Sequence, residues 1–258
     1  MSDRIATPTR SEPAPSETER ALCRSGLWEA LALGFAPPTE DTLRRLVAPE
    51  GAAGLAAIAA ALDEAGGTEI EPLVAALAAV APPLEVLRLV YARLFGHTAR
   101  GAAPPYETEY GEDSLFAPPR EMSDLGAFFR AFGLRVDAGA RERPDHIACE
   151  CEFLLVLARK EARAQALGDT PMWEATRDAG RAFLREHLGR WAPAFGASLA
   201  RLDAGGFYGA LGRLLAAFAA AECGRLGVVA GPEFLRLRTT VPDDTPAACG
   251  PLVTVPDG

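Results

Sequence analysis

Apolar side chains recur along most of the chain at the spacing of one helix face. The clearest stripe consists of Leu84, Leu87, Tyr91, Leu94 and Phe95. A second stripe consists of Ile147, Cys151, Leu154 and Ala158. Ala and Leu dominate the composition and β-branched residues are scarce, which favours helices over strands. The chain is therefore predicted to be all-α, a single helical bundle of roughly nine or ten helices.

Capping and breaking residues set the predicted helix ends. Ser16 and Glu19 form a capping-box pattern that opens the first helix. Thr39 is placed to cap a second, short helix, and Pro144 suits the first turn of the helix that carries the second stripe. Further helices are predicted at 51–64, 70–81, 84–95, 121–132, 172–188, 191–201 and 206–224.

Three segments lack a helical pattern. Residues 96–120 are rich in glycine and proline and are predicted to form a long loop, a feature that is uncommon inside a compact domain and usually functional. Residues 1–15 are polar and Pro-rich and are predicted to be disordered, while 239–258 are predicted to form a loose tail. The helical domain is accordingly expected to span 16–238.

Charge and cysteine content exclude several classes of protein. The net charge is −9, and the chain lacks the basic surface that nucleic-acid binding needs. The cysteine count is odd and no Cys-x-x-Cys pair occurs, which favours reduced cytoplasmic thiols over a structural zinc site. No export signal is recognisable, and the uncharged runs are too short to span a bilayer. We expect a soluble, cytoplasmic protein with no nucleic-acid partner and no stable membrane insertion.

Acidic residues concentrate in the middle of the chain. Between positions 103 and 152 there are eleven acids and five bases, a difference of six out of nine net negative charges. The acids are Glu107, Glu109, Glu112, Asp113, Glu121, Asp124, Asp137, Glu142, Asp145, Glu150 and Glu152. Beside the apolar stripes, this acidity would complement a basic, partly apolar peptide. A solvated polar face is the alternative interpretation.

The segment from Pro104 to Tyr110 is one candidate binding element. It places two tyrosines and two glutamates on a stiff, proline-led stretch, with Tyr106 and Glu107 following Pro105 directly. Tyrosine offers a ring and a hydroxyl and glutamate offers charge, so the segment suits recognition of a basic peptide. A packed surface loop anchored by its tyrosines explains the composition equally well.

A second candidate is the polar cluster at the start of the helix near 145–152. His146 and Glu150 are four residues apart and share a helix face, with Glu152 close in sequence. These residues define the rival hypothesis, an α-helical metalloenzyme. Helix-bundle metal sites usually draw Glu-x-x-His pairs from two helices, and that order is missing here. A polar helix start is the more common explanation, so we expect no metal, no cofactor and no catalytic residues.

Five blocks, in this order, resemble the TorD/DmsD/NarJ family of molybdoenzyme maturation chaperones. They are Tyr91-x-x-Leu94-Phe95, Pro104-Pro105-Tyr106-Glu107-Thr108-Glu109-Tyr110, Met122 to Leu134, Arg143-Pro144-Asp145-His146-Ile147 with Glu150 and Phe153, and His187-Leu188-x-x-Trp191-x-Pro193-x-Phe195. The loop is most similar to that of chaperones serving dimethylsulfide and ethylbenzene dehydrogenases and selenate or chlorate reductases.

The resemblance implies a dedicated chaperone and not an enzyme. Members bind the apo catalytic subunit of an oxidoreductase that carries a molybdopterin guanine dinucleotide cofactor, and they shield its twin-arginine leader until the cofactor is inserted. Guanine nucleotide binding has been suggested for relatives, but no phosphate loop is present in this chain. A monomer or a homodimer is compatible with the sequence.

The resemblance also implies where a leader peptide would bind. Apolar walls and anchors are expected from Tyr91, Leu94, Phe95, Pro105, Tyr106, Tyr110 and Phe129. Polar and charged contacts are expected from Glu107, Glu109, Arg143, Asp145, His146 and Glu150.

Overall fold

The computed structural model describes residues 15–66, 69–96, 100–112, 117–135 and 143–239. The predicted disordered start and most of the predicted loose tail lie outside these residues. The elements are α1 (Glu17–Phe35), α2 (Glu40–Leu46), α3 (Pro49–Gly66), α4 (Glu71–Ala78), α5 (Leu84–Phe95), the 3₁₀-helix η1 (Glu107–Glu109), α6 (Ala117–Ala131), α7 (Ile147–Leu167), α8 (Thr170–Glu186), α9 (Leu188–Leu202) and α10 (Phe207–Arg225). In the described ranges the only β-type pairings are isolated bridges, so the all-α prediction is confirmed.

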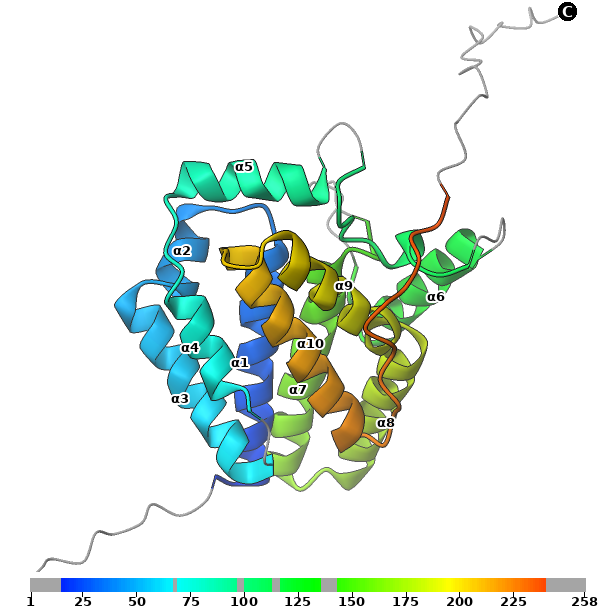
Figure 1. The fold of residues 1–258 in the computed structure, drawn as a ribbon. Helices are drawn as coiled ribbons and strands as arrows, with labels where there is room; N and C mark the ends of the chain where they lie inside the picture. The colour runs from blue at the N-terminus through cyan, green and yellow to red at the C-terminus, as the bar shows by residue number, and fades with distance from the viewer. Residues whose placement is uncertain (1–14, 67–68, 97–99, 113–116, 136–142, 240–258) are drawn as a thin grey trace, which may run out of the picture.

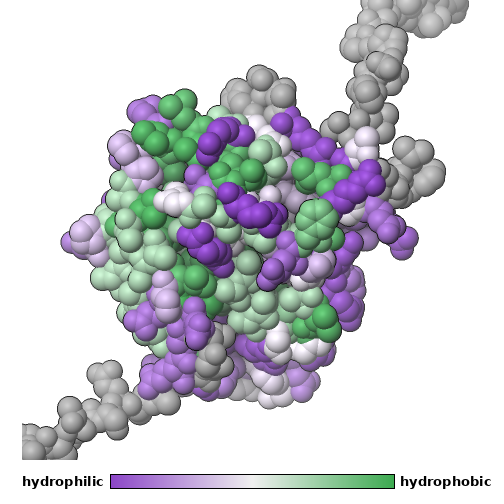
Figure 2. Space-filling view, viewed as in Figure 1, coloured by the Kyte–Doolittle hydropathy of each residue, from purple (hydrophilic) through white to green (hydrophobic). Residues whose placement is uncertain are grey.

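Two helix pairs form the centre of the bundle. α1 packs along α7 and α9 packs along α10, while α3 and α4 cover one flank and α8 covers the other (Figure 1). α5 lies across one end of the bundle, where Val86 and Leu89 are exposed and apolar surface gathers (Figure 2). Among the residues described, no helix alone is long and apolar enough to cross a bilayer; α2 and α3 meet those criteria only as a pair, bent by 50°.

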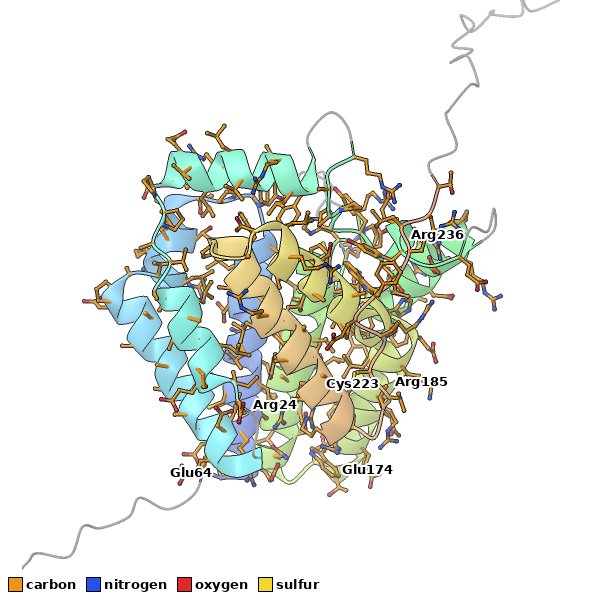
Figure 3. All side chains as sticks on the ribbon, viewed as in Figure 1. Arg24, Glu64, Glu174, Arg185, Cys223 and Arg236 are labelled. Atoms are coloured by element: carbon orange, nitrogen blue, oxygen red, sulfur yellow. The ribbon has the colours of Figure 1, made fainter. Side chains whose placement is uncertain are left out.

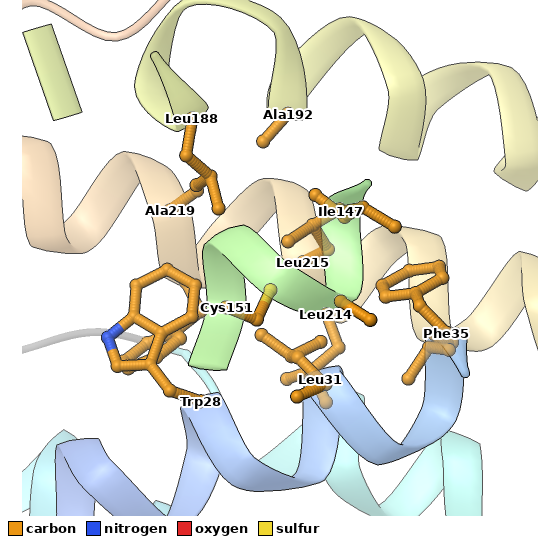
Figure 4. Close-up of a cluster of buried hydrophobic side chains, with 14 of the residues drawn as sticks. Trp28, Leu31, Phe35, Ile147, Cys151, Leu188, Ala192, Leu214, Leu215 and Ala219 are labelled. Atoms are coloured by element: carbon orange, nitrogen blue, oxygen red, sulfur yellow. The ribbon is translucent and has the colours of Figure 1, made fainter. Parts of the chain in front are cut away.

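The core combines the predicted stripe of α7 with apolar side chains of α1, α9 and α10. Side chains of α1 such as Trp28 and Leu31 face Cys151 of α7, with Leu188 of α9 and Leu215 of α10 completing the cluster (Figure 4). Each of these side chains is almost fully buried. Burial of a large apolar side chain stabilises a fold by about 1.5–3 kcal/mol, so this cluster accounts for much of the driving force that holds the helices together.

Glycines allow α9 and α10 to approach closely. A Cβ atom added at Gly196 would lie 2.3 Å from the carbonyl oxygen of Gly212, and one added at Gly212 would lie 2.7 Å from that of Gly196. Real Cβ atoms do not tolerate such contacts, so larger residues at this crossing would force the two helices apart.

Most helix ends agree with the capping pattern. Ser16 and Glu19 form the predicted capping box of α1, and Thr39 caps α2 through the backbone N–H of Thr42. α6 begins four residues earlier than predicted, because a proline in the first turn of a helix needs no intrahelical N–H bond and Pro118 is tolerated there. The predicted 96–120 loop therefore ends at the start of α6.

Two predicted helix ends are wrong. Pro144 was expected inside the first turn of α7, but that helix begins at Ile147 with His146 as its N-cap. A helix was predicted to end at residue 188, just before Gly189, and the next to begin at 191. Gly189 instead lies in the first turn of α9, and the break falls at His187, whose backbone angles are not helical (φ −126°, ψ −110°). Gly189 serves packing instead, since a Cβ there would lie 2.3 Å from the carbonyl oxygen of Leu184.

After α10 the chain returns over the bundle as an extended strap, residues 228–239. It runs past α8 and α9 toward α6 (Figure 1). Its backbone meets the loop before α6: Leu237 forms a bridge with Tyr110, and Gly111 donates its N–H to the carbonyl oxygen of Arg236 at 2.9 Å. The described chain thus ends beside the segment that the sequence marks as a candidate binding element.

Candidate functional site

The Pro104–Tyr110 segment and the start of α7 lie side by side. Glu107 donates its backbone N–H to the carbonyl oxygen of Asp145 at 2.9 Å. Ile147 donates its backbone N–H to the carbonyl oxygen of Pro105, also at 2.9 Å. Tyr106 and His146 form an antiparallel bridge between these two contacts. The two candidate elements are about forty residues apart in the sequence, so only the fold brings them together.

Asp145 is the polar centre of this junction. Its carboxylate is fully buried and accepts four hydrogen bonds, from the N–H and hydroxyl of Thr108 (3.3 and 2.7 Å) and from Nε and Nη2 of Arg143 (2.9 and 2.7 Å). Arg143 also lies over the ring of Tyr106, 4.6 Å from its centroid. A buried carboxylate with this many donors is satisfied, and it fixes the loop against α7.

His146 is buried and acts as the N-cap of α7. Its Nδ1 accepts the backbone N–H of Ala148 at 3.1 Å, which places the ring proton on Nε2. Burial, with a smaller contribution from the charge of Arg143, lowers the pKa of His146 to about 4. The imidazole is therefore neutral near pH 7, and its ring packs edge-on against Tyr106.

A second buried network lies beneath the loop. Glu107 places Oε2 3.0 Å from Nδ1 of His187, and the carboxylate of Glu150 accepts the indole N–H of Trp191 at 3.2 Å. Burial raises the pKa of Glu107 despite its contact with His187. Burial also raises the pKa of Glu150 well above its ordinary value, and the nearby charge of Glu107 adds to this effect. Two acids in one dry region disfavour each other's ionisation.

A small cavity opens above Glu107. It has a volume of about 200 Å³ and its lining includes Glu107, Tyr110, Glu121, Arg190 and Trp191, together with strap residues. Within the described structure, Oε1 of Glu107 is buried without a hydrogen-bond partner; the nearest cation is Nη1 of Arg190 at 3.8 Å. One of the residues that line the cavity thus carries a buried acceptor whose hydrogen bond is not made within the described part of the chain.

Several predicted contact residues are part of the hydrophobic core. Leu94, Phe95, Tyr110 and Phe129 are all nearly inaccessible. The hydroxyl of Tyr110 donates to the carbonyl oxygen of Pro104, and Tyr91 is half-buried, with its ring against Phe95 and Tyr208. Glu109 pairs with Arg100 at 2.7 Å. A ligand would reach the buried members only after part of the loop moved, and their role in binding stays a prediction.

The geometry does not support the metalloenzyme hypothesis. Nδ1 of His146 is used by the helix cap, Glu150 is bound to Trp191, and Glu152 is exposed on another face of α7. Across the described ranges, three or more histidine, cysteine, aspartate or glutamate side chains never gather at one point as metal ligands would. Side chains two residues apart in a helix point to different faces, so Glu150 and Glu152 cannot bind one metal ion together although they are close in sequence.

Four groups at the site were not predicted as site residues from the sequence. His187 was named only as part of a motif, yet its ring contacts Glu107. Trp191, four residues later, reaches Glu150, and the two cations Arg190 and Arg238 lie against the loop region. The motif that contains both His187 and Trp191 was the available signal; their partners, far away in the sequence, were not predictable from it.

The acidic surplus is partly neutralised by arginines from outside the acidic stretch. Arg100 pairs with Glu109, and Arg238 pairs with Glu121 at 2.9 Å. Asp145, Glu107 and Glu150 are buried and do not act as a solvated acidic face. The concentration of acids therefore reflects specific pairing at one junction more than a general surface field.

The chain belongs to the nitrate reductase delta subunit family, the TorD/NarJ family. The model of that family matches residues 59–197, more than half of the chain, and this range contains the loop, the start of α7, His187 and Trp191. The resemblance drawn from the motifs is thereby confirmed.

Curated relatives give the same family. The chain is 32% identical over 127 residues to the chaperone protein TorD of Vibrio cholerae serotype O1 (48% of this chain, 55% of the relative). It is 33% identical over 186 residues to the dimethyl sulfide dehydrogenase assembly chaperone protein of Rhodovulum sulfidophilum (66% of each chain). It is 37% identical over 75 residues to the perchlorate reductase assembly chaperone protein of Dechloromonas aromatica (29% and 33%). The chain thus spans about half the length of the TorD proteins that it matches.

Proposed function

We propose that this chain is a cytoplasmic assembly chaperone for a molybdopterin-dependent oxidoreductase and is not itself an enzyme. It would bind the apo catalytic subunit and its twin-arginine leader and hold both until the cofactor is inserted. Family membership supports this proposal, as do the relatives that are named assembly chaperones. Asp145, His146 and Glu150 are buried and have structural partners, which is the arrangement of a binding scaffold more than of a reactive centre.

The observation that carries the site assignment is the carboxylate of Glu107. Its Oε1 is buried and lacks a hydrogen-bond partner in the described residues, and Glu107 is one of the residues that line the cavity. A guanidinium of the leader would supply the missing donors in a fixed, planar geometry. Glu121 also lines this cavity, and its side chain is only 14% exposed.

Most of the other predicted residues would divide into three roles. Tyr106 and Arg143 are accessible at the edge of the loop and would contact the leader directly. Asp145, His146 and Glu150 are buried and would position the loop without touching the ligand. Leu94, Phe95, Pro105, Tyr110 and Phe129 would support that position from the core.

Purification from the native host, followed by identification of the co-purifying subunit, tests the partner. Calorimetric titration of that subunit's leader then tests the site. Glu107→Gln should weaken leader binding about tenfold, because a desolvated charge contact contributes roughly 1.5–3 kcal/mol. Glu85→Gln on α5 is the matched control, since Glu85 is exposed and pairs only with Arg88 in the same helix.

The pH dependence gives a second readout of the same contact. Burial raises the pKa of Glu107, and a bound cation needs the ionised carboxylate. Affinity should therefore increase as the pH rises from the ordinary carboxyl range through the raised pKa, and Glu107→Gln should remove this increase. Equal affinities of wild type and Glu107→Gln at every pH would exclude Glu107 from the site. A native preparation with no oxidoreductase subunit would contradict the chaperone proposal.

A further inference from the structure

The strap is bound to the candidate site in the way a peptide ligand would be. Arg238 donates its backbone N–H to the carbonyl oxygen of Glu109 at 2.8 Å, and Gly111 donates to Arg236 at 2.9 Å. These two contacts flank the bridge between Tyr110 and Leu237. Backbone pairing of an extended segment with an exposed edge is a common mode of peptide recognition, because it is independent of most side chains.

One arginine of the strap supplies the specific contact. Arg238 forms a two-pronged ion pair with Glu121, with both N···O distances at 2.9 Å, and also donates to the carbonyl oxygens of Thr108 and Glu112. Its side chain is 11% exposed and that of Glu121 is 14% exposed. Arg236, two residues earlier, is exposed, and its Nη2 lies 3.5 Å from Oγ1 of Thr239 (Figure 3). The surface therefore distinguishes one arginine position along an extended chain.

The strap fills this surface incompletely. The 200 Å³ cavity above Glu107 lies on one side of Leu235, and a second cavity of about 300 Å³, lined by Ala194 and Ser198 among others, lies on its other side. Phe234 lines the second cavity but is 73% exposed, so its ring covers that cavity only in part. A peptide with an apolar residue better placed for that cavity, and a second cation for Glu107, would make contacts that the strap does not make.

We propose that the loop Glu107–Gly111, with Glu121 of α6, is a receptor for an extended arginine-bearing peptide, and that the strap occupies it as an internal mimic of the leader. The leader would bind by displacing the strap and placing one of its arginines where Arg238 lies. This inference rests on the proposed function for the identity of the incoming peptide. The strap is tethered, so its effective concentration is in the millimolar range, and only a peptide with better contacts would displace it.

The test uses a fluorescent peptide with the sequence of residues 228–239, added to the full-length protein. Wild type should bind it weakly, because its own strap fills the surface. Arg238→Ala should bind it at least tenfold more tightly, whereas Arg236→Ala, the matched control, should behave as wild type. The same peptide with Arg238→Ala should bind each protein at least tenfold more weakly. Arg238→Lys keeps the positive charge but loses the bidentate guanidinium contact, so its affinity for the peptide should be intermediate. It also provides a folded variant if Arg238→Ala is unstable.

Competition with the leader of the co-purified subunit completes the experiment. Displacement of the fluorescent peptide by the leader would support the inference. A leader that binds the protein without displacing the peptide would overturn it and leave the chaperone proposal intact. If the leader binds no variant while the strap peptide binds Arg238→Ala, the receptor surface is supported and leader recognition is contradicted. Equal affinity of the strap peptide for wild type and Arg238→Ala would overturn the inference.

Discussion

Replacing Asp145 with alanine is expected to destabilise the fold, because the Asp145 carboxylate is fully buried and joins the loop to α7. Asp145→Ala removes four hydrogen bonds. The side chain of Arg143 is 43% exposed and would hydrogen-bond to water instead, so the loss of its two bonds destabilises the fold only slightly. The N–H and hydroxyl of Thr108 are buried and lose their acceptor, at about 1 kcal/mol or more each.

These contributions add to a loss of about 2–3 kcal/mol in the free energy of unfolding. For a domain of this size, each kcal/mol lowers the melting temperature by roughly 2–4 °C, so a decrease of about 4–12 °C is expected. Asp145→Asn keeps one acceptor oxygen and should lose about half as much. The measurements are calorimetric melting and urea unfolding of the full-length protein.

The matched control is Asp124→Ala on α6, an exposed acid whose loss should change stability by less than about 0.5 kcal/mol. If Asp145→Ala melts within 2 °C of wild type, the proposed network of Asp145, Arg143 and Thr108 does not stabilise the fold. If, in addition, leader affinity falls, Asp145 would be a direct contact, as its place in the sequence motif first indicated.

Three further predictions concern the buried acids, the helix cap and the helix crossing. Because the pKa of Glu150 is raised in the folded state, protonated Glu150 stabilises the fold at low pH, and this stabilisation is lost as the pH rises above the ordinary carboxyl range. Glu150→Gln should therefore gain stability relative to wild type with increasing pH, measured as the difference between their urea midpoints. A difference that stays constant with pH would contradict this prediction. The pKa of His146 is lowered to about 4 in the folded state, so neutral His146 stabilises the fold fully above its ordinary pKa near 6.5, and this stabilisation is lost as the pH falls toward 4. His146→Asn can still cap α7 and should therefore lose less stability in acid than wild type. Identical stability profiles of the two proteins in acid would refute this assignment. Gly212→Ala should destabilise the fold by about 1–3 kcal/mol through the crossing with α9, whereas Gly224→Ala in the same helix meets no neighbour and should be neutral or slightly stabilising; equal thermal melts of the two variants would contradict the packing argument.

The helical architecture was predictable because it depends on local pattern. The stripe around Leu87 and Leu94 and the stripe around Ile147 and Cys151 each repeat at the helical period, and both are buried where predicted. The capping box at Ser16 is formed by residues three apart and was also predictable. Errors occurred at helix ends, such as Gly189, where a glycine needed for close packing resembles a glycine that ends a helix.

The site was only partly predictable, because its energetics depend on contacts between distant segments. The motifs marked Glu107, Asp145 and Glu150 as unusual, but nothing in their sequence context showed that they would be buried. Asp145 binds Thr108 and Glu150 binds Trp191, each about forty residues away in the sequence. Glu121 binds Arg238, which is more than a hundred residues away. The spacing of residues along the sequence determines which of them share a helix face. Burial and charge pairing are properties of the packed tertiary structure. Only that structure determined which of these acids have hydrogen-bond partners and which one, Glu107, leaves an oxygen without a partner among the described residues, beside a cavity.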